Sequence, residues 1–461
     1  MNIIVIVSDT LRRDHLGLYG NKWIRTPNLD RLARESVVFD RAYTGSFPTI
    51  PHRTDLFTGR FSFTYCDWSP LRKEEIVTQQ VLGDAGYTSM LIVDTPHMIK
   101  DGFMFDRGFS GWTWIRGQEN DRYMTDPIEV NIPCDPNKLR GTVRTVTQYL
   151  RNVSQRKHEE DYFAPQTLGT AAKWLERNYK QDKFFLHVDT FDPHEPWDPP
   201  AYYTEMYDPG YQGEEVIYPI YGPCDYLSEA ELKHMRALYA GEVSMVDHWV
   251  GVLMAKVEEL GLLDKTVIVF TTDHGFYIGE HELTGKVTLL YEEVNHIPLI
   301  VRLPDGRGRR TDAIVQPPDI MPTLLDLAGV EIPKTVHGKS FAAVLRGESK
   351  SHRDIAVSSW SIVHEPVRQP ADKERVVLNP YTWAELAWKL KPSTIVDGEW
   401  ALIVGAGDLA PEMYHLPSDP QQRKNVFEQN RPVAERLHKA YIRFLESVGT
   451  NPDFIAPRRT L

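Results

Sequence analysis

Cysteine and long apolar runs are both scarce in this sequence. The 461 residues include three cysteines, Cys66, Cys134 and Cys224, an odd number without the spacing of a metal-binding motif. No apolar run approaches the roughly 20 residues that a membrane-spanning helix needs. The chain enters the apolar stretch 3–7 without the basic segment and cleavage site of a signal peptide. We therefore expect a cytoplasmic, reducing location and no membrane partner.

Positive charge is also in deficit. The chain has 52 basic and 64 acidic residues, a formal net charge of −12, and no stretch concentrates lysine and arginine. Proteins that bind nucleic acid carry such a basic patch, so nucleic acid is not an expected partner. With 41% hydrophobic and 25% charged residues, the composition is that of a folded globular protein, and disorder is excluded.

Short apolar runs alternate with helical stretches, the pattern of a mainly parallel sheet covered on both faces. The expected strands are 3–7, 89–93, 184–188, 267–270 and 298–301. Thr26 and Pro27 provide an N-cap and a first helical residue, and 230–260 has amphipathic helical spacing. The sequence therefore predicts an α/β fold.

After Gly347 the hydrophobic pattern changes to short runs in which apolar and polar residues alternate, followed by a helix near 433–448. We expect a large domain over 1–350 and a small α+β subdomain with an antiparallel sheet over 351–461. The polar stretch 117–161 has the character of a long insertion. The tail 449–461 is interpreted as a segment that packs on a neighbouring copy rather than a helix, which would make a homo-oligomer.

Three predicted strands end in an acidic residue, Asp9, Asp189 and Asp273. The carboxyl ends of strands in open α/β sheets face the ligand crevice, so these carboxylates are expected to converge. His274 follows Asp273, and together with Asp9 the two can offer oxygen and nitrogen donors to one divalent ion. An ordinary polar turn is the alternative for 272–275.

The segment 49–60 predicts the start of a helix, with Thr49 as N-cap. A helix N-terminus favours an anion, and Arg53, one turn on, can donate two hydrogen bonds to it. The alternative is a capped surface helix. His194 lies in a proline-rich loop after the strand 184–188. Three roles are open for it: a general acid, a donor to a substrate oxygen, or a structural residue.

Taken in order, these segments resemble the sulfatase branch of the alkaline phosphatase superfamily. Thr49-x-Pro51-x-Arg53, ending in Thr58-Gly59-Arg60, is similar to the family's Cys/Ser-x-Pro-Ser-Arg signature. Further motifs in the family's order are Ser8-Asp9-Thr10, Pro193-His194-x-Pro196, Asp273-His274-Gly275 with Lys286, 318–324, 337–340 and 413–416. The resemblance covers nearly the whole chain. It implies a three-layer α/β/α domain with a large, mostly parallel sheet, plus a small C-terminal antiparallel sheet and helix.

The resemblance also implies roles for individual residues. One divalent metal ion would be bound by Asp9, Thr49, Asp273 and His274. Mixed oxygen and nitrogen ligation favours Zn or Mn, with Mg or Ca as alternatives. The catalytic residues would be Thr49 as nucleophile, with Arg53, His194, Lys286 and the further candidate His97 binding and stabilising the transferring group.

Three departures from the family pattern bear on the substrate. Sulfatases convert Cys or Ser at the first signature position into formylglycine, but the β-carbon of Thr49 bears a methyl group and cannot become an aldehyde. Where sulfatases commonly read Gly-Lys-Trp-His, this chain has Thr95 in place of the lysine, two residues before His97. Loss of that cation suits a phosphate diester or phosphonate monoester. His52 replaces the signature's second serine, a change without an explanation.

We therefore predict a metal-dependent hydrolase that cleaves phosphate diesters or phosphonate monoesters through a covalent phosphothreonine at Thr49. Its partner would be a small anionic ester substrate. Two alternatives stay open: hydrolysis of sulfate esters without formylglycine, by attack of Thr49 or of water, and a non-catalytic homologue that binds an anion. The presence of a nucleophile together with a complete set of metal ligands argues against the last.

Overall fold

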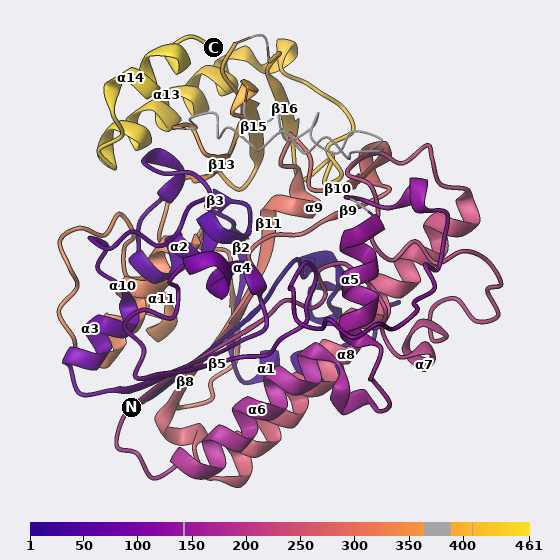
Figure 1. The fold of residues 1–461 in the computed structure, drawn as a ribbon. Helices are drawn as coiled ribbons and strands as arrows, with labels where there is room; N and C mark the ends of the chain where they lie inside the picture. Colours follow the sequence, from indigo (N-terminus) through magenta and orange to yellow (C-terminus); the bar gives the residue numbers. More distant parts are fainter. Residues whose placement is uncertain (142, 364–388, 408) are drawn as a thin grey trace.

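A sheet of eight strands runs through the centre of the larger part of the molecule, in the order β12-β2-β11-β8-β1-β6-β4-β5 (Figure 1). The computed structural model describes residues 1–141, 143–363, 389–407 and 409–461. The strands are β1 (Asn2–Ser8), β2 (Val37–Tyr43), β4 (Thr88–Val93), β5 (Gly111–Trp114), β6 (Phe184–Thr190), β8 (Thr266–Thr271), β11 (His296–Arg302) and β12 (Arg309–Thr311). Neighbours are parallel except β11, which is antiparallel to β2 and β8.

Helices cover both faces of this sheet, because successive residues of β1 point into different cores. Ile4 and Ile6 pack in the core beneath α1 (Pro27–Arg34), α6 (Phe163–Asn178) and α8 (Glu229–Glu259). Ile3, Val5 and Val7 pack in the core beneath α2 (Thr49–Thr58), α3 (Thr78–Asp84), α10 (Ile320–Ala328) and α11 (Ala342–Arg346). Figure 1 shows α6 and α8 on one side and α2, α3, α10 and α11 on the other. The predicted three-layer α/β/α fold is confirmed.

A second, five-stranded sheet in the order β16-β15-β14-β13-β3 forms the C-terminal part. β13 (Ala356–Trp360), β14 (Ser393–Val396), β15 (Trp400–Val404) and β16 (Glu412–His415) are antiparallel, and α13 (Arg431–Ser447) packs on them. The predicted small sheet with its helix is therefore present. Its edge strand, β3 (Ser46–Phe47), comes from the N-terminal part and is parallel to β13. Through β3, the small sheet is thus connected to the segment that immediately precedes Thr49.

The C-terminal tail corrects one interpretation made from the sequence. Residues Pro452–Ile455 form a short helix, α14, and Ile455 is buried in the core formed by α13 and the small sheet. His438 Nε2 lies 2.8 Å from the Arg458 carbonyl oxygen, a further contact of the tail with α13. The tail therefore forms a helix and packs on its own chain, because its apolar side chains complete this core. The homo-oligomer stays a prediction without support from the tail.

The polar stretch 117–161 contains one longer helix, α5 (Val143–Val153), whose Val146 and Tyr149 are buried. Smaller elements are α4 (Pro96–Ile99), α7 (Ala201–Thr204), α9 (Glu292–Asn295) and the sheet of β7 (Gly222–Pro223), β9 (Tyr277–Ile278) and β10 (Leu283–Gly285). Among the helices of the described residues, none has the length and hydropathy of a membrane span.

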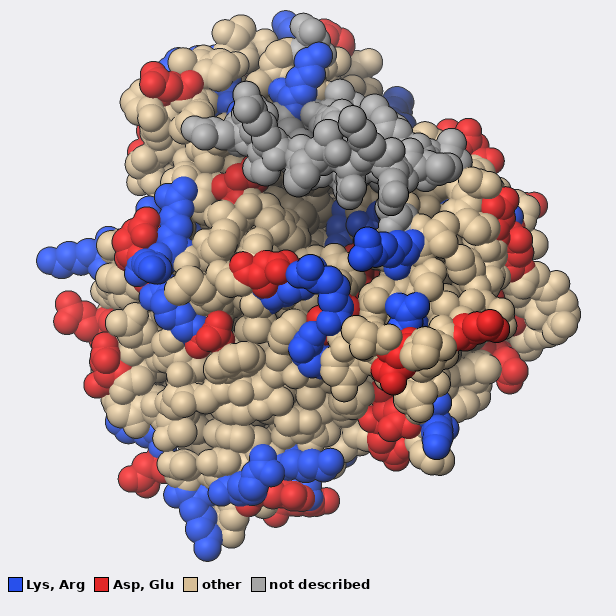
Figure 2. Space-filling view, viewed as in Figure 1, with Lys and Arg blue, Asp and Glu red and all other residues tan. Residues whose placement is uncertain are grey.

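Charge is mixed on the face of the molecule shown in Figure 2. Basic and acidic side chains alternate there, and wide areas carry neither. A contiguous basic patch of the kind that binds nucleic acid is not seen among the described residues of this face. The absence of a nucleic-acid partner stays a prediction.

Candidate active site

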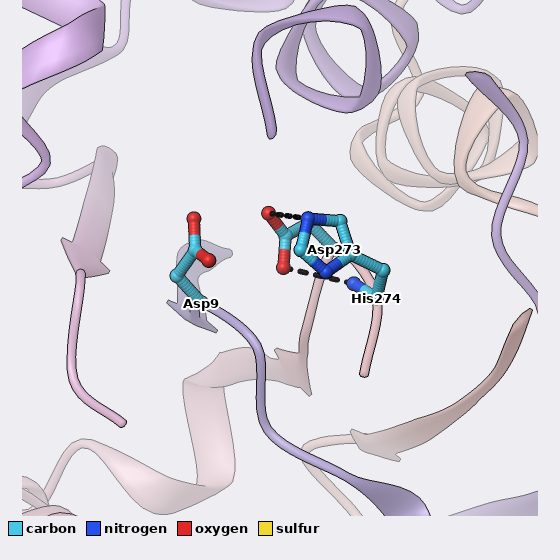
Figure 3. Close-up of side chains that lie close together, drawn as sticks. All are labelled: Asp9, Asp273 and His274. Carbon is cyan, nitrogen blue, oxygen red and sulfur yellow. Dashed lines mark hydrogen bonds and ion pairs between the residues drawn. The ribbon is translucent and has the colours of Figure 1, made fainter. Parts of the chain in front are cut away.

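Asp9, Asp273 and His274 meet at the carboxyl ends of two neighbouring strands. Asp9 follows β1 directly, and Asp273 and His274 lie two and three residues after β8. One donor atom from each lies within 4.8 Å of the others, and all three side chains are 0% exposed. Figure 3 shows Asp9 facing the other two residues. The structure therefore brings together the three residues for which the sequence predicted a common ion.

The ring of His274 is held in a defined state. Its Nδ1 lies 3.0 Å from the Gly275 carbonyl oxygen, so Nδ1 carries the proton and Nε2 is left as an acceptor. Nε2 lies 3.3 Å from Asp273 Oδ2 and 3.5 Å from Thr49 Oγ1. Burial lowers the pKa of His274 to about 3, which keeps the ring neutral. Neutral imidazole with its second nitrogen tied to a carbonyl is the usual state of a metal ligand.

Arg53 lies among three carboxylates and is 0% exposed. Its Nη1 donates to Asp9 Oδ2 at 2.8 Å and also to Asp273 Oδ2. Its Nε and Nη2 donate to the two oxygens of Asp189 at 3.1 and 2.8 Å. Asp189 bonds Arg53 through both of its oxygens and does not belong to the group of donors, Asp9, Asp273 and His274, that lie close enough to share one ion. Thr95 Oγ1 donates to the same Asp189 carboxylate at 2.7 Å.

The charge of the cluster and the chemistry of its donors fit a divalent cation. Asp9, Asp189 and Asp273 outnumber the nearby cations Arg53 and Lys286. Burial and the repulsion of Asp273 raise the pKa of Asp9 well above its usual value, because a negative charge there lacks compensation. Carboxylate oxygens, an imidazole nitrogen and a hydroxyl are all suitable ligands for such an ion. Asp9, Asp273, His274 and Thr49 are the residues that would hold it.

Thr49 is the first residue of α2 and is 2% exposed. The N-cap is Pro48, so the expectation that Thr49 caps the helix is wrong by one residue, and the contact of the Thr49 hydroxyl is with His274 Nε2 rather than with a backbone N–H. The hydroxyl is thereby free to face His274. Phe47, just before the turn, packs its ring 4.8 Å from that of His274 and 4.7 Å from that of Trp360 in β13. The small sheet therefore supports the segment that carries Thr49.

Lys286 and His194 lie close enough to influence each other. Lys286 is 8% exposed, and its charge acts on Asp9, His194 and His274. Burial and then Lys286 lower the pKa of His194 well below its usual value. The Nδ1 of His194 lies 2.6 Å from the Glu195 carbonyl oxygen, and its ring stacks on Phe191 at 3.9 Å. In the neutral ring, Nε2 is therefore an acceptor.

His97, in α4, is tied to the inserted segment. Its Nε2 lies 2.9 Å from Glu119 Oε2, and Arg140 Nη2 donates to Glu119 Oε1 at 3.0 Å and to Glu195 Oε1 at 2.8 Å. Glu119, Arg140 and Glu195 were not identified from the sequence. Glu119 and Arg140 lie in the polar insertion, where a charged residue is an ordinary feature of a solvated surface, and Glu195 is the unspecified position of the motif Pro193-His194-x-Pro196. Their clustering depends on loop packing.

The chain is similar in sequence to known proteins. The model of the Sulfatase family matches residues 1–330. An arylsulfatase of Clostridium perfringens is 27% identical over 403 residues, which cover 77% of this chain and 80% of that protein. A multifunctional alkaline phosphatase superfamily protein of Trinickia caryophylli is 27% identical over 412 residues, 75% of this chain and 77% of that protein.

Solved structures share the fold. The crystal structure of the phosphonate monoester hydrolase of Agrobacterium radiobacter matches with a TM-score of 0.75 at 24% identity, over 97% of this chain and 95% of that one. Both sheets and the helices around them are included in a match of this extent. Given the family match over 1–330 and the motif order, the chain belongs to the sulfatase family of hydrolases, within the alkaline phosphatase superfamily.

Proposed function

We propose that the chain hydrolyses phosphate diesters or phosphonate monoesters, with Thr49 as the nucleophile. The position of the Thr49 hydroxyl carries this proposal. It is buried at the first turn of α2, 3.5 Å from His274 Nε2 and one turn before Arg53. Because its β-carbon bears a methyl group, threonine cannot supply the aldehyde that sulfatases use. The hydroxyl itself is the group left to attack.

The reaction has two steps in this proposal. Thr49 Oγ forms a bond to phosphorus while the bond from phosphorus to the leaving alcohol breaks, and the alcohol gains a proton as the threonine loses one. Water then hydrolyses the threonine ester and restores the hydroxyl. A divalent ion held by Asp9, Asp273 and His274 would supply Lewis-acid activation when bound. Arg53 and Lys286 provide positive charge where negative charge develops on the non-bridging oxygens.

His194 is proposed to donate the proton to the leaving oxygen. Its Nδ1 is engaged with the Glu195 carbonyl, so Nε2 is the atom that can exchange a proton with a substrate. Burial and Lys286 hold the ring neutral before substrate binds. The negative charge of an ester beside the ring counteracts the charge of Lys286 and so favours the protonated ring. Substrate binding would therefore prepare the acid that the first step needs.

The supply of cations favours a substrate with a single negative charge. The guanidinium of Arg53 is shared among Asp9, Asp189 and Asp273, and Thr95 stands where sulfatases commonly have a lysine. A phosphate diester or phosphonate monoester carries one negative charge on its non-bridging oxygens, so it needs fewer cations than a dianionic monoester. The fold shared with a phosphonate monoester hydrolase is compatible with this substrate class.

Hydrolysis of sulfate esters is the second candidate. One observation favours it: the 27% identical relative from Clostridium perfringens is named an arylsulfatase. Sulfate monoesters are also singly charged, so the charge argument does not separate the two candidates. In this alternative the attack on sulfur would come from Thr49 or from water, without formylglycine.

The test is a panel of nitrophenyl phosphate diesters, phosphonate monoesters, phosphate monoesters and sulfate esters, assayed with Zn, Mn, Mg and Ca. Thr49→Ser should keep part of the rate, whereas Thr49→Val, which keeps the shape without the hydroxyl, should abolish turnover. Quenched-reaction mass spectrometry should find a phosphoryl adduct on the peptide that contains Thr49.

Thr54→Val is the matched control, because Thr54 is buried in the same helix and its hydroxyl bonds to the Ile50 carbonyl oxygen. It should retain the wild-type rate. If Thr49→Val hydrolyses phosphodiesters at the native rate, threonine is not the nucleophile. A panel in which sulfate esters alone are cleaved would favour the second candidate.

A further inference from the structure

The side chains around His97 and His194 form one connected set, here called the histidine network: His97, Glu119, Arg140, Glu195 and His194. At one end His97 Nε2 lies 2.9 Å from Glu119 Oε2. At the other, His194 Nδ1 lies 3.3 Å from Glu195 Oε2 and 2.6 Å from the Glu195 carbonyl oxygen. Each histidine is thus in contact with its own carboxylate residue.

Arg140 connects the two carboxylates. Its Nη2 donates to Glu119 Oε1 at 3.0 Å and to Glu195 Oε1 at 2.8 Å. The guanidinium lies over the rings of Tyr218 and Tyr221, 4.3 and 4.2 Å from their centroids. The same two tyrosines donate their hydroxyls to Glu119 and Glu195, at 2.6 and 2.5 Å. A planar cation held between two rings in this way has little freedom to turn.

The two carboxylates of the network are buried, and the backbone of Glu119 and Arg140 is constrained. Glu119 and Glu195 side chains are 4% and 0% exposed, and Arg140 is 21% exposed. The Arg140 N–H donates to the Tyr218 carbonyl at 2.8 Å, which fixes the loop that carries the arginine. Glu119 has a φ of 43°, a left-handed conformation that is costly for a residue other than glycine. Such a conformation persists where surrounding contacts determine it, and it is found disproportionately at functional sites.

We propose that Arg140 is a positioning residue, which fixes the ring orientation of His97 through Glu119 and holds Glu119 and Glu195 in place beside His194. The inference rests on the proposed function, since it takes both histidines as groups that face the reacting ester. It assigns a role to the inserted segment, which the family motifs do not cover. Arg140 does not itself touch the ester. Removing it would leave two buried carboxylates without their shared cation and loosen the hold of Glu119 on the His97 ring, whereas the His194 ring keeps its contacts with the Glu195 carbonyl and Phe191.

Electrostatics give this role a signature that packing alone would not produce. The charged groups that face His194 are Lys286, Glu119, Arg140 and the Glu195 carboxylate. Burial lowers the pKa of His194 most, then Lys286; Arg140 lowers it further, whereas Glu119 raises it. Arg140→Met should therefore raise the pKa of His194, and Glu119→Gln should lower it. Mere loosening of the loop would move the pKa in the same direction in both variants.

The experiment uses the full chain labelled with ¹³C and ¹⁵N in histidine, with His97→Ala and His194→Ala to assign the signals among its 16 histidines. Wild type should show each of the two rings in one tautomer. In Arg140→Met the His97 ring should show mixed tautomers, and the pKa of His194 should rise, because a charge that lowers it is removed. Glu119→Gln should shift it downward. Arg140→Lys keeps the positive charge but not the two-armed guanidinium. It should disturb the tautomer of His97 and change the pKa of His194 less than Arg140→Met does.

Kinetics supply the second readout. Arg140→Met should lower kcat on poor leaving groups about 10–100-fold, the usual cost of losing a group that orients a functional histidine, with KM changed far less. Arg122→Met is the control, because Arg122 lies in the same segment, is 77% exposed and pairs with exposed Asp101. It should match wild type in every measurement.

The proposal is overturned if folded Arg140→Met keeps the His97 ring in its wild-type tautomer and the pKa of His194 unchanged. If that variant does not fold, the same spectra are measured on Glu119→Gln. Spectra of Glu119→Gln that match those of wild type would also overturn the proposal. The spectra need no turnover, so they judge Arg140 even if no phosphorus ester is a substrate. Failure of the proposed function appears separately, as retained activity in Thr49→Val.

Discussion

Two parts of the candidate site are built in different ways. Asp9, Asp273 and His274 stand at the ends of central strands whose residues are all buried, and Arg53 is held there by α2. The histidine network comes instead from α4, the inserted segment and the loop after β6. The first part is determined by the order of strands in the sheet. The second depends on how separate loops pack against one another.

This difference predicts how each part responds to change. Strand ends are fixed by a whole sheet, so a side chain can be removed there without moving its neighbours. Loop positions are fixed by a few hydrogen bonds, so loss of one contact spreads to others. Substitutions in the first part should therefore affect chemistry with little effect on fold. Substitutions in the second should give smaller, graded losses.

The largest effect is expected for Asp273→Ala. It removes a proposed metal ligand, so turnover should fall below detection, and elemental analysis should find little bound metal. The fold should persist, as judged by circular dichroism, because the side chain lies at a strand end. Asp305→Ala, at an exposed aspartate that pairs with Arg307, should change neither property. Undiminished metal in Asp273→Ala would remove this residue from the site.

His194→Ala should have the next largest effect, and it depends on the substrate. Without the proposed acid, esters of poor leaving groups should react about 10²–10⁴-fold more slowly, whereas nitrophenyl esters need little protonation and should lose much less. The ratio of kcat/KM between an alkyl and a nitrophenyl ester measures this. Equal losses on both would assign His194 to binding of the ester rather than to proton transfer.

The sequence predicted the first part of the site well, for a physical reason. The strands β1, β6 and β8 are mainly apolar runs, and each has an acidic residue at or just after its carboxyl end: Asp9 follows β1, Asp189 is the next-to-last residue of β6, and Asp273 lies two residues after β8. Convergence then follows from parallel pairing. What the pattern could not tell is that all three carboxylates bond Arg53, and that Asp189 lies outside the group of donors formed by Asp9, Asp273 and His274. That choice depends on side-chain geometry.

Other features had no local signal. β3 is a strand of two residues, too short for any periodicity, yet it joins the small sheet to the Thr49 segment. Glu119, Arg140 and Glu195 lie at separate places in the sequence, and none is a defined position of a motif, so their pairing could not be predicted from spacing. The tail 449–461 was misinterpreted because its few apolar residues fill a core that only the folded subdomain reveals.

Thr95→Lys tests a position between the two parts of the site, because Thr95 lies just before α4 and its hydroxyl bonds to Asp189. A lysine restores the cation that sulfatases commonly have at this position. Preference for a dianionic phosphate monoester over a diester should rise about tenfold, the change that one favourable charge interaction of about 1.4 kcal/mol gives. Thr95→Ser, which keeps the hydroxyl, should leave the ratio of kcat/KM values unchanged. An unchanged ratio in the lysine variant would mean that substrate charge is selected elsewhere.

The smallest effect on activity is expected for Trp360→Ala, which tests whether the small sheet supports the first part of the site. Trp360 packs on Phe47, Phe47 packs on His274, and Thr49 follows two residues later. Loss of the ring should destabilise the protein by about 3–5 kcal/mol in denaturant unfolding and lower kcat a few-fold, because the Thr49 segment loses one of its supports. Trp400→Ala is the matched control: it lies in the same sheet and packs on His415, away from Thr49. It should cost less stability, and its kcat should equal wild type when both are measured well below their unfolding transitions. If Trp360→Ala also keeps the wild-type kcat, the small sheet contributes stability alone, and the geometry around Thr49 is maintained by α2 and the strand ends.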